Sequence, residues 1–307
     1  MTTTSLTQAT TPDGTRRLRK ARRDWRGWAF VAPFMIVFAA MIIAPVVYAI
    51  YLSLFRQQLI GGNAFVGLGN YVAVFQDEKF WASLGRVTIF LIVQVPIMLL
   101  LSLVAALALD SARLHGAGFF RIALFLPYAV PGVVAALIWG FIYGDQFGLT
   151  ASVNQLLGTG LAPLSGPWVL ASIGNIVTWE FMGYNMLIFY AALRVIPGEL
   201  YEAAEIDGAG AFRTVFSIKL PAIRGALVIA TIFSIIGSFQ LFNEPNLLKQ
   251  LAPNAISSYF TPNMYAYNLS FAGQQFNYAA TVAIVMGVVT AVIAYVVQLR
   301  GSRKELR

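Results

Sequence analysis

Residues 28–54 read WAFVAPFMIVFAAMIIAPVVYAIYLSL and contain no charged side chain. Because a helix needs roughly 20 mostly apolar residues to cross the hydrocarbon core of a bilayer, this stretch predicts a membrane span. The rest of the chain has the same character. Of 307 residues, 58% are hydrophobic and only 11% are charged, whereas soluble domains carry about 25% charged residues. We therefore expect an all-α, polytopic membrane protein, and we exclude an ordinary cytosolic enzyme and a disordered scaffold.

Five further apolar stretches follow the first, so that the sequence predicts six membrane-spanning helices. Their expected ranges are 28–54, 87–109, 122–143, 168–193, 226–242 and 279–298. Pro33, Pro45, Pro96 and Pro131 lie within these ranges. Membrane helices tolerate proline where neighbouring groups satisfy the freed backbone, and we expect kinks at these positions.

The distribution of basic residues predicts the orientation. Seventeen of the 21 lysines and arginines fall in the two tails and in the loops after the second and fourth spans, leaving Arg56, Lys79, Arg86 and Lys249 for the other side. Since cytoplasmic segments carry the excess of positive charge, both termini are expected in the cytoplasm. The net charge of +8 is thus a topology signal rather than an indication of nucleic-acid binding. We expect a disordered cytoplasmic tail over 1–24, a membrane domain over 25–299 and a second cytoplasmic tail over 300–307.

Several residue types and motifs are rare or absent, which excludes certain kinds of catalytic, metal and nucleotide site. The sequence has no cysteine and one histidine, His115, which excludes disulfides, Cys-ligated zinc and iron–sulfur clusters. Intramembrane proteolysis is also disfavoured, because neither a Ser–His pair, an HExxH motif nor a pair of aspartates lies within a span. The sequence contains no GxxxxGK[ST] phosphate-binding loop, and no nucleotide site of that kind is expected.

The loop over 194–224 differs from the others. It reads RVIPGELYEAAEIDGAGAFRTVFSIKLPAIR. Pro197 favours a helix start, with Glu199 where the helix dipole favours negative charge. Gly208 and Gly210 predict a break, and a second short helix is expected over 211–218, ending before Pro221. Two interpretations remain open at this point: a compact cytoplasmic projection, or an amphipathic hairpin lying on the lipid headgroups.

Within this loop the spacing of seven residues resembles the EAA signature of binding-protein-dependent ABC importer permeases. The matching positions are Glu202, Ala203, Ala204, Gly208, Ile218, Leu220 and Pro221. From about residue 25 to 297 the chain is also similar to the sugar-permease family of the maltose-transporter type, notably in GLGNY (67–71), FLPYAVP (125–131) and GYNMLIFYAALRVIPGELYEAAEIDGAG (183–210). It is most similar to the larger of the two maltose permeases, without that protein's two extra N-terminal spans and large external domain.

The resemblance implies a function and a set of partners. It implies a permease subunit, not itself an enzyme, of an ATP-driven importer for a di- or oligosaccharide in the bacterial plasma membrane. Its partners would be a second, homologous permease, an ATPase dimer that binds ATP and Mg²⁺, and an external solute-binding protein; this chain itself would hold no cofactor. The residues implied to couple it to the ATPase are Glu202, Ala203, Ala204, Asp207, Gly208, Ile218, Leu220 and Pro221.

Polar residues within the spans are candidates for binding substrate, because ionisable groups in a membrane are costly. Glu180 is the acid placed deepest in a span, and Tyr184 shares its helix face. The full set of candidates is Glu180, Tyr184, Asn185, Gln240, Asn243 and Tyr278. Amides and carboxylates bind sugar hydroxyls, but a structural hydrogen bond to a neighbouring span is the alternative for Glu180. For Gln94 we expect that structural role, and for Trp179, Phe239 and Phe242 we expect packing.

A secondary transporter with an internal repeat is the alternative function. No matched pair of broken helices is evident in the two halves of the sequence, and such a carrier would leave the signature unexplained. The two functions differ in that only the importer requires ATP and a binding protein.

Overall fold

The computed structural model describes residues 25–58, 62–111 and 114–302. The expected tail over 1–24 and residues 303–307 of the second tail lie outside the described residues. The helical elements are α1 (Trp25–Phe38), η1 (Ala39–Ile43), α2 (Ala44–Ser53), α3 (Gly69–Phe75), α4 (Glu78–Asp110), α5 (Ala117–Phe125), η2 (Leu126–Ala129), α6 (Gly132–Ile142), α7 (Leu149–Leu157), α8 (Val169–Leu193), α9 (Gly198–Ile206), α10 (Ala211–Thr214), η3 (Val215–Lys219), α11 (Leu220–Ala222), α12 (Arg224–Phe239), α13 (Asn243–Leu248), α14 (Pro262–Phe271) and α15 (Phe276–Ser302).

Five helical segments among the described residues are long and apolar enough to cross a membrane. They are Gly27–Ser53, Glu78–Asp110, Val169–Leu193, Arg224–Leu248 and Phe276–Gly301. A sixth candidate is a bent pair, Ala117–Ala129 and Gly132–Ile142, whose two parts meet at 97°. The predicted all-α membrane fold is confirmed, with six spans if the bent pair counts as one.

The third predicted span is therefore not one helix. Val130 and Pro131 both have extended backbones, with ψ of 128° and 132°. Proline lacks the N–H that a continuing helix needs and restricts the residue before it to extended conformations, so the helix stops and restarts there. By contrast, Pro33 and Pro96 lie inside α1 and α4. The expected kink at Pro131 is thus a full break.

The described residues divide into two compact units, one up to Tyr48 and the other from Ala49 onward. In the first, α1 runs through the π-helical turn η1 into α2, and the Ala44 N–H donates to the Ala39 carbonyl. The wider turn ends at Ile43, and Ala44 and Pro45 follow it; Pro45 has no N–H to contribute to a regular helical ladder.

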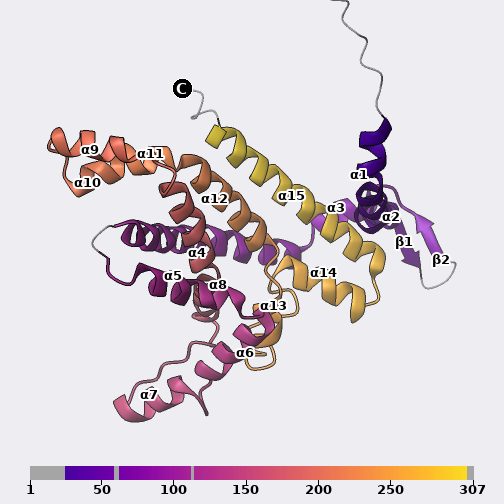
Figure 1. Cartoon of the computed structure of the whole chain (residues 1–307). Helices are drawn as coiled ribbons and strands as arrows, with labels where there is room; N and C mark the ends of the chain where they lie inside the picture. Colours follow the sequence, from indigo (N-terminus) through magenta and orange to yellow (C-terminus); the bar gives the residue numbers. More distant parts are fainter. Residues whose placement is uncertain (1–24, 59–61, 112–113, 303–307) are drawn as a thin grey trace, which may run out of the picture. The chain divides into compact units, whose positions relative to one another are not determined.

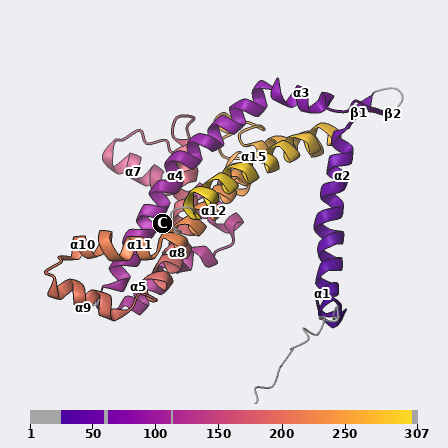
Figure 2. The ribbon, with the colours of Figure 1, turned by 90° about the horizontal axis from the view of Figure 1, so that it is seen from above.

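In the second unit α4 packs along α8, and α12 packs against α15 and α4 (Figure 1). Three buried clusters fill the contacts. One centres on Ile173 and Ile176 of α8, another on Val282 of α15, and a third joins Ala106 and Phe189 near the end of α4. Figures 1 and 2 both show α9, α10 and α11 projecting together from one end of this unit, beside the start of α12.

The segments between the spans contain more structure than the sequence predicted. An antiparallel hairpin pairs β1 (Phe55–Gln58) with β2 (Gly62–Phe65), in a register that places Phe55 opposite Phe65. Asn70 secures its base, because its amide donates to the Ser53 and Phe55 carbonyls at 2.8 and 2.7 Å. The long segment after α12 forms α13 and α14.

Candidate functional site

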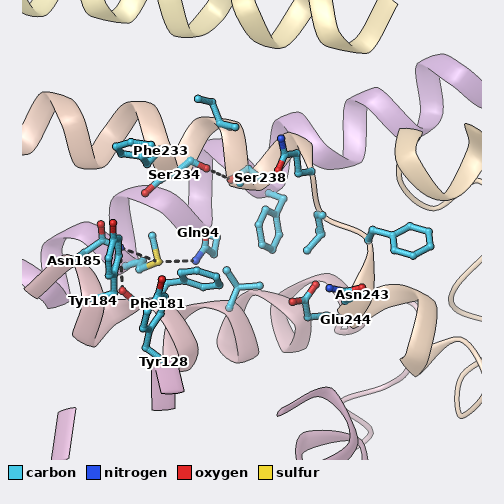
Figure 3. A pocket seen from close by; sticks show the side chains of 18 residues that line it. Gln94, Tyr128, Phe181, Tyr184, Asn185, Phe233, Ser234, Ser238, Asn243 and Glu244 are labelled. Carbon is cyan, nitrogen blue, oxygen red and sulfur yellow. Dashed lines mark hydrogen bonds between the residues drawn. The ribbon is translucent and has the colours of Figure 1, made fainter. Parts of the chain in front are cut away.

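Between α4, α8, α12 and α13 lies a cavity of about 390 Å³ (Figure 3). Four of the six predicted substrate residues line it: Tyr184, Asn185, Gln240 and Asn243. They come from two different candidate spans, and Asn185 and Gln240 lie 55 positions apart (240 − 185), so the fold brings together what the sequence only suggested. The other lining residues are Phe90, Gln94, Met98, Tyr128, Val177, Phe181, Phe233, Ser234, Ile236, Gly237, Ser238, Leu241, Phe242 and Glu244.

One end of the cavity is an aromatic wall. The rings of Tyr128 and Tyr184 stack with centroids 4.7 Å apart and planes 18° apart, and Phe181 meets Tyr128 edge-on at 5.8 Å. Figure 3 shows this pair at one end of the cavity and Asn243 with Glu244 at the other. Tyr128 was not among the predicted site residues. It comes from the short turn η2 before the break at Pro131, and only its place within FLPYAVP could have marked it.

This wall depends on a close approach between helices. An atom added at the Cβ position of Gly183 in α8 would lie 1.9 Å from the Leu124 carbonyl oxygen and 2.8 Å from the Phe125 Cα. Glycine is therefore required there, because it lets the backbone of α5 pack directly on α8. The contact fixes the position of η2, which follows α5 and carries Tyr128.

Two amide side chains, Gln94 and Asn185, line the cavity with hydrogen bonds of their own. Gln94 of α4 donates to the Thr178 hydroxyl of α8 at 3.2 Å and to the Met98 sulfur at 3.4 Å. The predicted interhelical hydrogen bond of Gln94 is confirmed, although this residue also lines the cavity. The Asn185 amide donates to the Phe181 carbonyl at 3.0 Å. Among the described residues no group donates to its carbonyl oxygen, which can accept from a ligand.

Two buried carboxylates lie at or near the other end. Glu244 lines the cavity and is 8% exposed. Glu180 is 4% exposed, and its Oε2 has no hydrogen-bond partner among the described residues. Its Oε1 lies 3.5 Å from the Cβ position of Gly132 in α6, and Glu180 is not among the residues that line the cavity. The structural hydrogen bond considered for Glu180 is therefore not seen for Oε2.

Tyr278 lies apart from this cavity. Its hydroxyl donates to Asp77 Oδ2 at 2.8 Å, and the Tyr265 hydroxyl donates to the same oxygen at 2.5 Å. Burial raises the pKa of Asp77, but the hydrogen bonds to its carboxylate lower the pKa by a larger amount. The pKa therefore lies below its ordinary value of 3.8. Asp77 also caps α4 through the Lys79 N–H. Tyr278 thus joins α15 to the start of α4.

The predicted coupling residues form a helix–turn–helix unit. α9 ends at Ile206 with Asp207 as its C-cap, and Gly208 has a φ of +70°. The Ala209 N–H donates to the Ala204 carbonyl and the Gly208 N–H to the Glu205 carbonyl, the bond pattern of a Schellman C-cap. A left-handed residue is needed at this position, which explains glycine at 208. Within this unit Ala204 is buried, whereas Glu202 and Ala203 are exposed.

The second helix of the loop is longer than predicted. α10 continues through the π-helical turn η3 into α11, and Pro221 lies in the first turn of α11 instead of marking the end of the helix. Proline is tolerated in a first helical turn because the N–H there has no intrahelical partner. The expected stop before Pro221 is wrong. Ile218 and Leu220 are half-buried, on the segment that leads into α12.

The projecting unit exposes large apolar side chains. Val195, Ile206 and Phe212 are 80%, 87% and 78% exposed, and the rings of Phe212 and Phe216 are tilted by 39° with centroids 4.5 Å apart. An exposed apolar surface of this kind is typical of a contact with another protein or with membrane lipid.

Comparisons with known proteins agree with this arrangement. The family model described as "Binding-protein-dependent transport system inner membrane component" matches residues 65–304. The lactose transport system permease protein LacF of Rhizobium radiobacter is 33% identical over 89% of this chain and 92% of its own length. The diacetylchitobiose uptake system permease protein NgcF of Streptomyces coelicolor is 32% identical over 88% of this chain and 80% of its own. A chain from the crystal structure of a bacterial alginate ABC transporter, in complex with alginate pentasaccharide-bound periplasmic protein, matches with a TM-score of 0.77, 22% identity and coverage of 92% and 95%.

Proposed function

Because this chain belongs to the family of binding-protein-dependent transport system inner membrane components, we propose that it is the permease subunit of an ATP-driven importer that carries a di- or oligosaccharide across the bacterial plasma membrane. The observation that carries this proposal is the family match over residues 65–304. That range includes both the cavity and the loop of α9 to α11.

The chemistry of the cavity supports a neutral sugar. Its polar lining consists of amides, serine and tyrosine hydroxyls and the Glu244 carboxylate, with no lysine or arginine among the lining residues. Amides both donate and accept hydrogen bonds, as sugar hydroxyls do. A phosphorylated or carboxylated ligand would meet no cation here. The volume of about 390 Å³ lies within the usual range of about 300–1,000 Å³ for ligand pockets.

We further propose that the loop of α9 to α11 docks on the ATPase. Glu202 and Ala203 are exposed on α9, where Glu202 can pair with a cation and Ala203 leaves room for close approach. Ala204, Asp207 and Gly208 shape the turn, while Ile218, Leu220 and Pro221 anchor the second helix. Since the chain has no phosphate-binding loop, ATP and Mg²⁺ would be bound by the ATPase dimer.

The remaining partners and the orientation follow from the same proposal. A second, homologous permease would complete the translocation pathway, and an external solute-binding protein would deliver the sugar. The excess of basic residues in the tails and in this loop supports a cytoplasmic position for the loop and both termini. Cavity residues near the middle of the membrane would then be exposed to alternate sides as the loop moves.

The first test is to isolate the tagged chain from its native membrane in mild detergent and identify the co-purifying proteins by mass. The importer predicts an ATPase and a second six-span protein. Reconstituted with the binding protein, the complex should take up labelled lactose, chitobiose or maltose only with ATP. Recovery of the chain alone, with uptake that needs no ATP, would indicate the secondary transporter instead.

The coupling assignment is tested by Glu202→Lys. We expect the complex to assemble in the membrane but to lose ATP-dependent sugar uptake, because the reversed charge opposes the contact with the ATPase. Glu205→Lys is the matched control, with the same charge change one helical turn away at an exposed position outside the signature. Equal uptake by both variants would contradict a role for Glu202.

A further inference from the structure

A single ion pair among the described residues links the loop to the long helix α4. The Lys219 Nζ donates to Asp110 Oδ2 at 2.6 Å, and the two side chains are only 15% and 8% exposed. Lys219 is the last residue of η3, and Asp110 is the last residue of α4, 109 residues earlier in the chain. In such a sheltered setting an ion pair is screened much less than at the surface.

Asp110 lies where a carboxylate is electrostatically unfavourable unless a cation is close to it. The C-terminus of a helix carries partial negative charge, so a carboxylate in the last turn is unfavourable on its own. The last turn of α4 contains no basic residue to offset it. Lys219 supplies that charge from the loop, and the two helix ends are therefore tied electrostatically.

The geometry of the loop directs Lys219 toward α4. η3 is a π-helical turn, in which the Leu220 N–H donates to the Val215 carbonyl. The wider turn shifts the residues after it around the helix axis, and such turns are frequent at functional sites. The Lys219 ammonium also lies 5.3 Å from the ring centroid of Tyr201 on α9, so that both helices of the loop meet the same cation.

The helix that receives this contact also forms the cavity. Phe90, Gln94 and Met98 of α4 line it, and Gln94 bonds to Thr178 of α8. α4 is a continuous helix of 33 residues, so a displacement at its Asp110 end moves these side chains as well. A physical route thus leads from the loop, through one ion pair, to the cavity.

We propose that Lys219 and Asp110 are positioning residues: their ion pair is a strut that makes the loop of α9 to α11 and the helix α4 move as one body. This inference rests on the proposed function, because it requires an ATPase that moves the loop. In the signature, residue 219 is the unspecified position between Ile218 and Leu220, and the structure gives it a role.

The test uses the whole complex, reconstituted with its ATPase and binding protein. The wild-type complex is first shown to contain the ATPase and to import sugar; failure at that step rejects the proposed function, not the strut. Lys219→Met and Asp110→Asn should then keep the ATPase bound and hydrolysing ATP, but lose roughly tenfold in sugar taken up per ATP. Lys219→Arg, which keeps the charge, should restore most of the coupling. Arg213→Met is the control, since Arg213 is an exposed cation on the same projection.

A cross-link separates the strut from a merely structural role. This chain has no cysteine, so Asp110→Cys/Lys219→Cys introduces one defined pair. The double variant should be uncoupled, and a short bifunctional thiol reagent should restore coupling, with the treated wild-type complex as control. Should the single variants fail to assemble, the charge exchange Asp110→Lys/Lys219→Asp takes their place and should remain coupled. Unchanged uptake per ATP in Lys219→Met, or a cross-linked complex that stays uncoupled, would overturn the proposal.

Discussion

Replacement of Gly183 by alanine should damage both the stability of the protein and its cavity. The added methyl carbon would lie 1.9 Å from the Leu124 carbonyl oxygen, about 1.5 Å short of an ordinary contact. The atoms that this methyl carbon would meet are not the ends of flexible side chains. Both atoms of the Leu124 carbonyl and the Phe125 Cα belong to the backbone of α5, so relief of the clash requires α5 to move away from α8.

The magnitude follows from two opposing terms. Alanine in place of glycine inside a helix is worth up to about 1 kcal/mol in propensity, while overpacking of a well-packed core costs about 1–3 kcal/mol and occasionally more. Because the obstacle here is backbone, we expect the upper part of that range, a net loss of about 2 kcal/mol. For a domain of this size such a loss lowers the Tm by roughly 4–8 °C. The displaced α5 also carries η2 with it, which separates Tyr128 from Tyr184.

Tryptophan fluorescence during heating, in detergent, measures the first effect, and the KM for sugar uptake measures the second. Gly287→Ala is the matched control: Gly287 lies inside α15, and an added Cβ there would meet nothing within 4 Å. That variant should be as stable as the wild type or slightly more stable. If Gly183→Ala has the same Tm as Gly287→Ala and transports sugar normally, the close packing of α5 on α8 is refuted.

Three further predictions concern other contacts. Because the pKa of Asp77 is lowered in the folded protein, its stabilising effect is present above the ordinary value of 3.8 and is lost as the pH falls through the lowered value. Asp77→Asn should therefore be less stable at pH 6 and lose less Tm between pH 5 and 3 than the wild type does; parallel pH curves would contradict this. Asn243→Ala and Tyr184→Leu should raise the KM for sugar without preventing assembly, whereas Tyr184→Phe, which keeps the stacked ring, should stay close to the wild type; unaltered kinetics across a range of sugars in all three would remove both residues from the site. Asn70→Ala leaves the buried Ser53 carbonyl and the half-buried Phe55 carbonyl without this donor and should cost about 1–3 kcal/mol, measured as a lower Tm; an unchanged Tm would show that water replaces the amide.

Much of the site could be anticipated because its parts are local in sequence. Gly208 and Gly210 predicted the break in the loop, because glycine favours a turn, and Gly208 with Ala204 belongs to the C-cap of one helix. Pro131 predicted an interruption in the third span, although its size, a 97° bend, depends on how the two parts pack. The tyrosine pair of the cavity wall could not be predicted in this way, since Tyr128 and Tyr184 come from different helices.

Tyr278 was predicted to contact sugar, but the structure places it outside the cavity. Its aromatic hydroxyl side chain and its place before the last span suggested a sugar contact. The structure instead shows its hydroxyl bonded to Asp77, 201 residues away. An aromatic hydroxyl can satisfy a buried carboxylate as well as a sugar, and the sequence does not distinguish the two. Only the relative placement of α4, α14 and α15 decides which partner is within reach.

The sequence by itself determined that this is a membrane protein, which segments can span the bilayer and where a loop with two short helices interrupts them. These properties follow from transfer free energies and turn preferences that accumulate over neighbouring residues. Tertiary structure alone decided that Gly183 lets α5 touch α8, that four polar residues share one cavity and that Lys219 meets Asp110. Each of these contacts joins residues on different helices, and its energy depends on helix positions fixed jointly by packing throughout the domain.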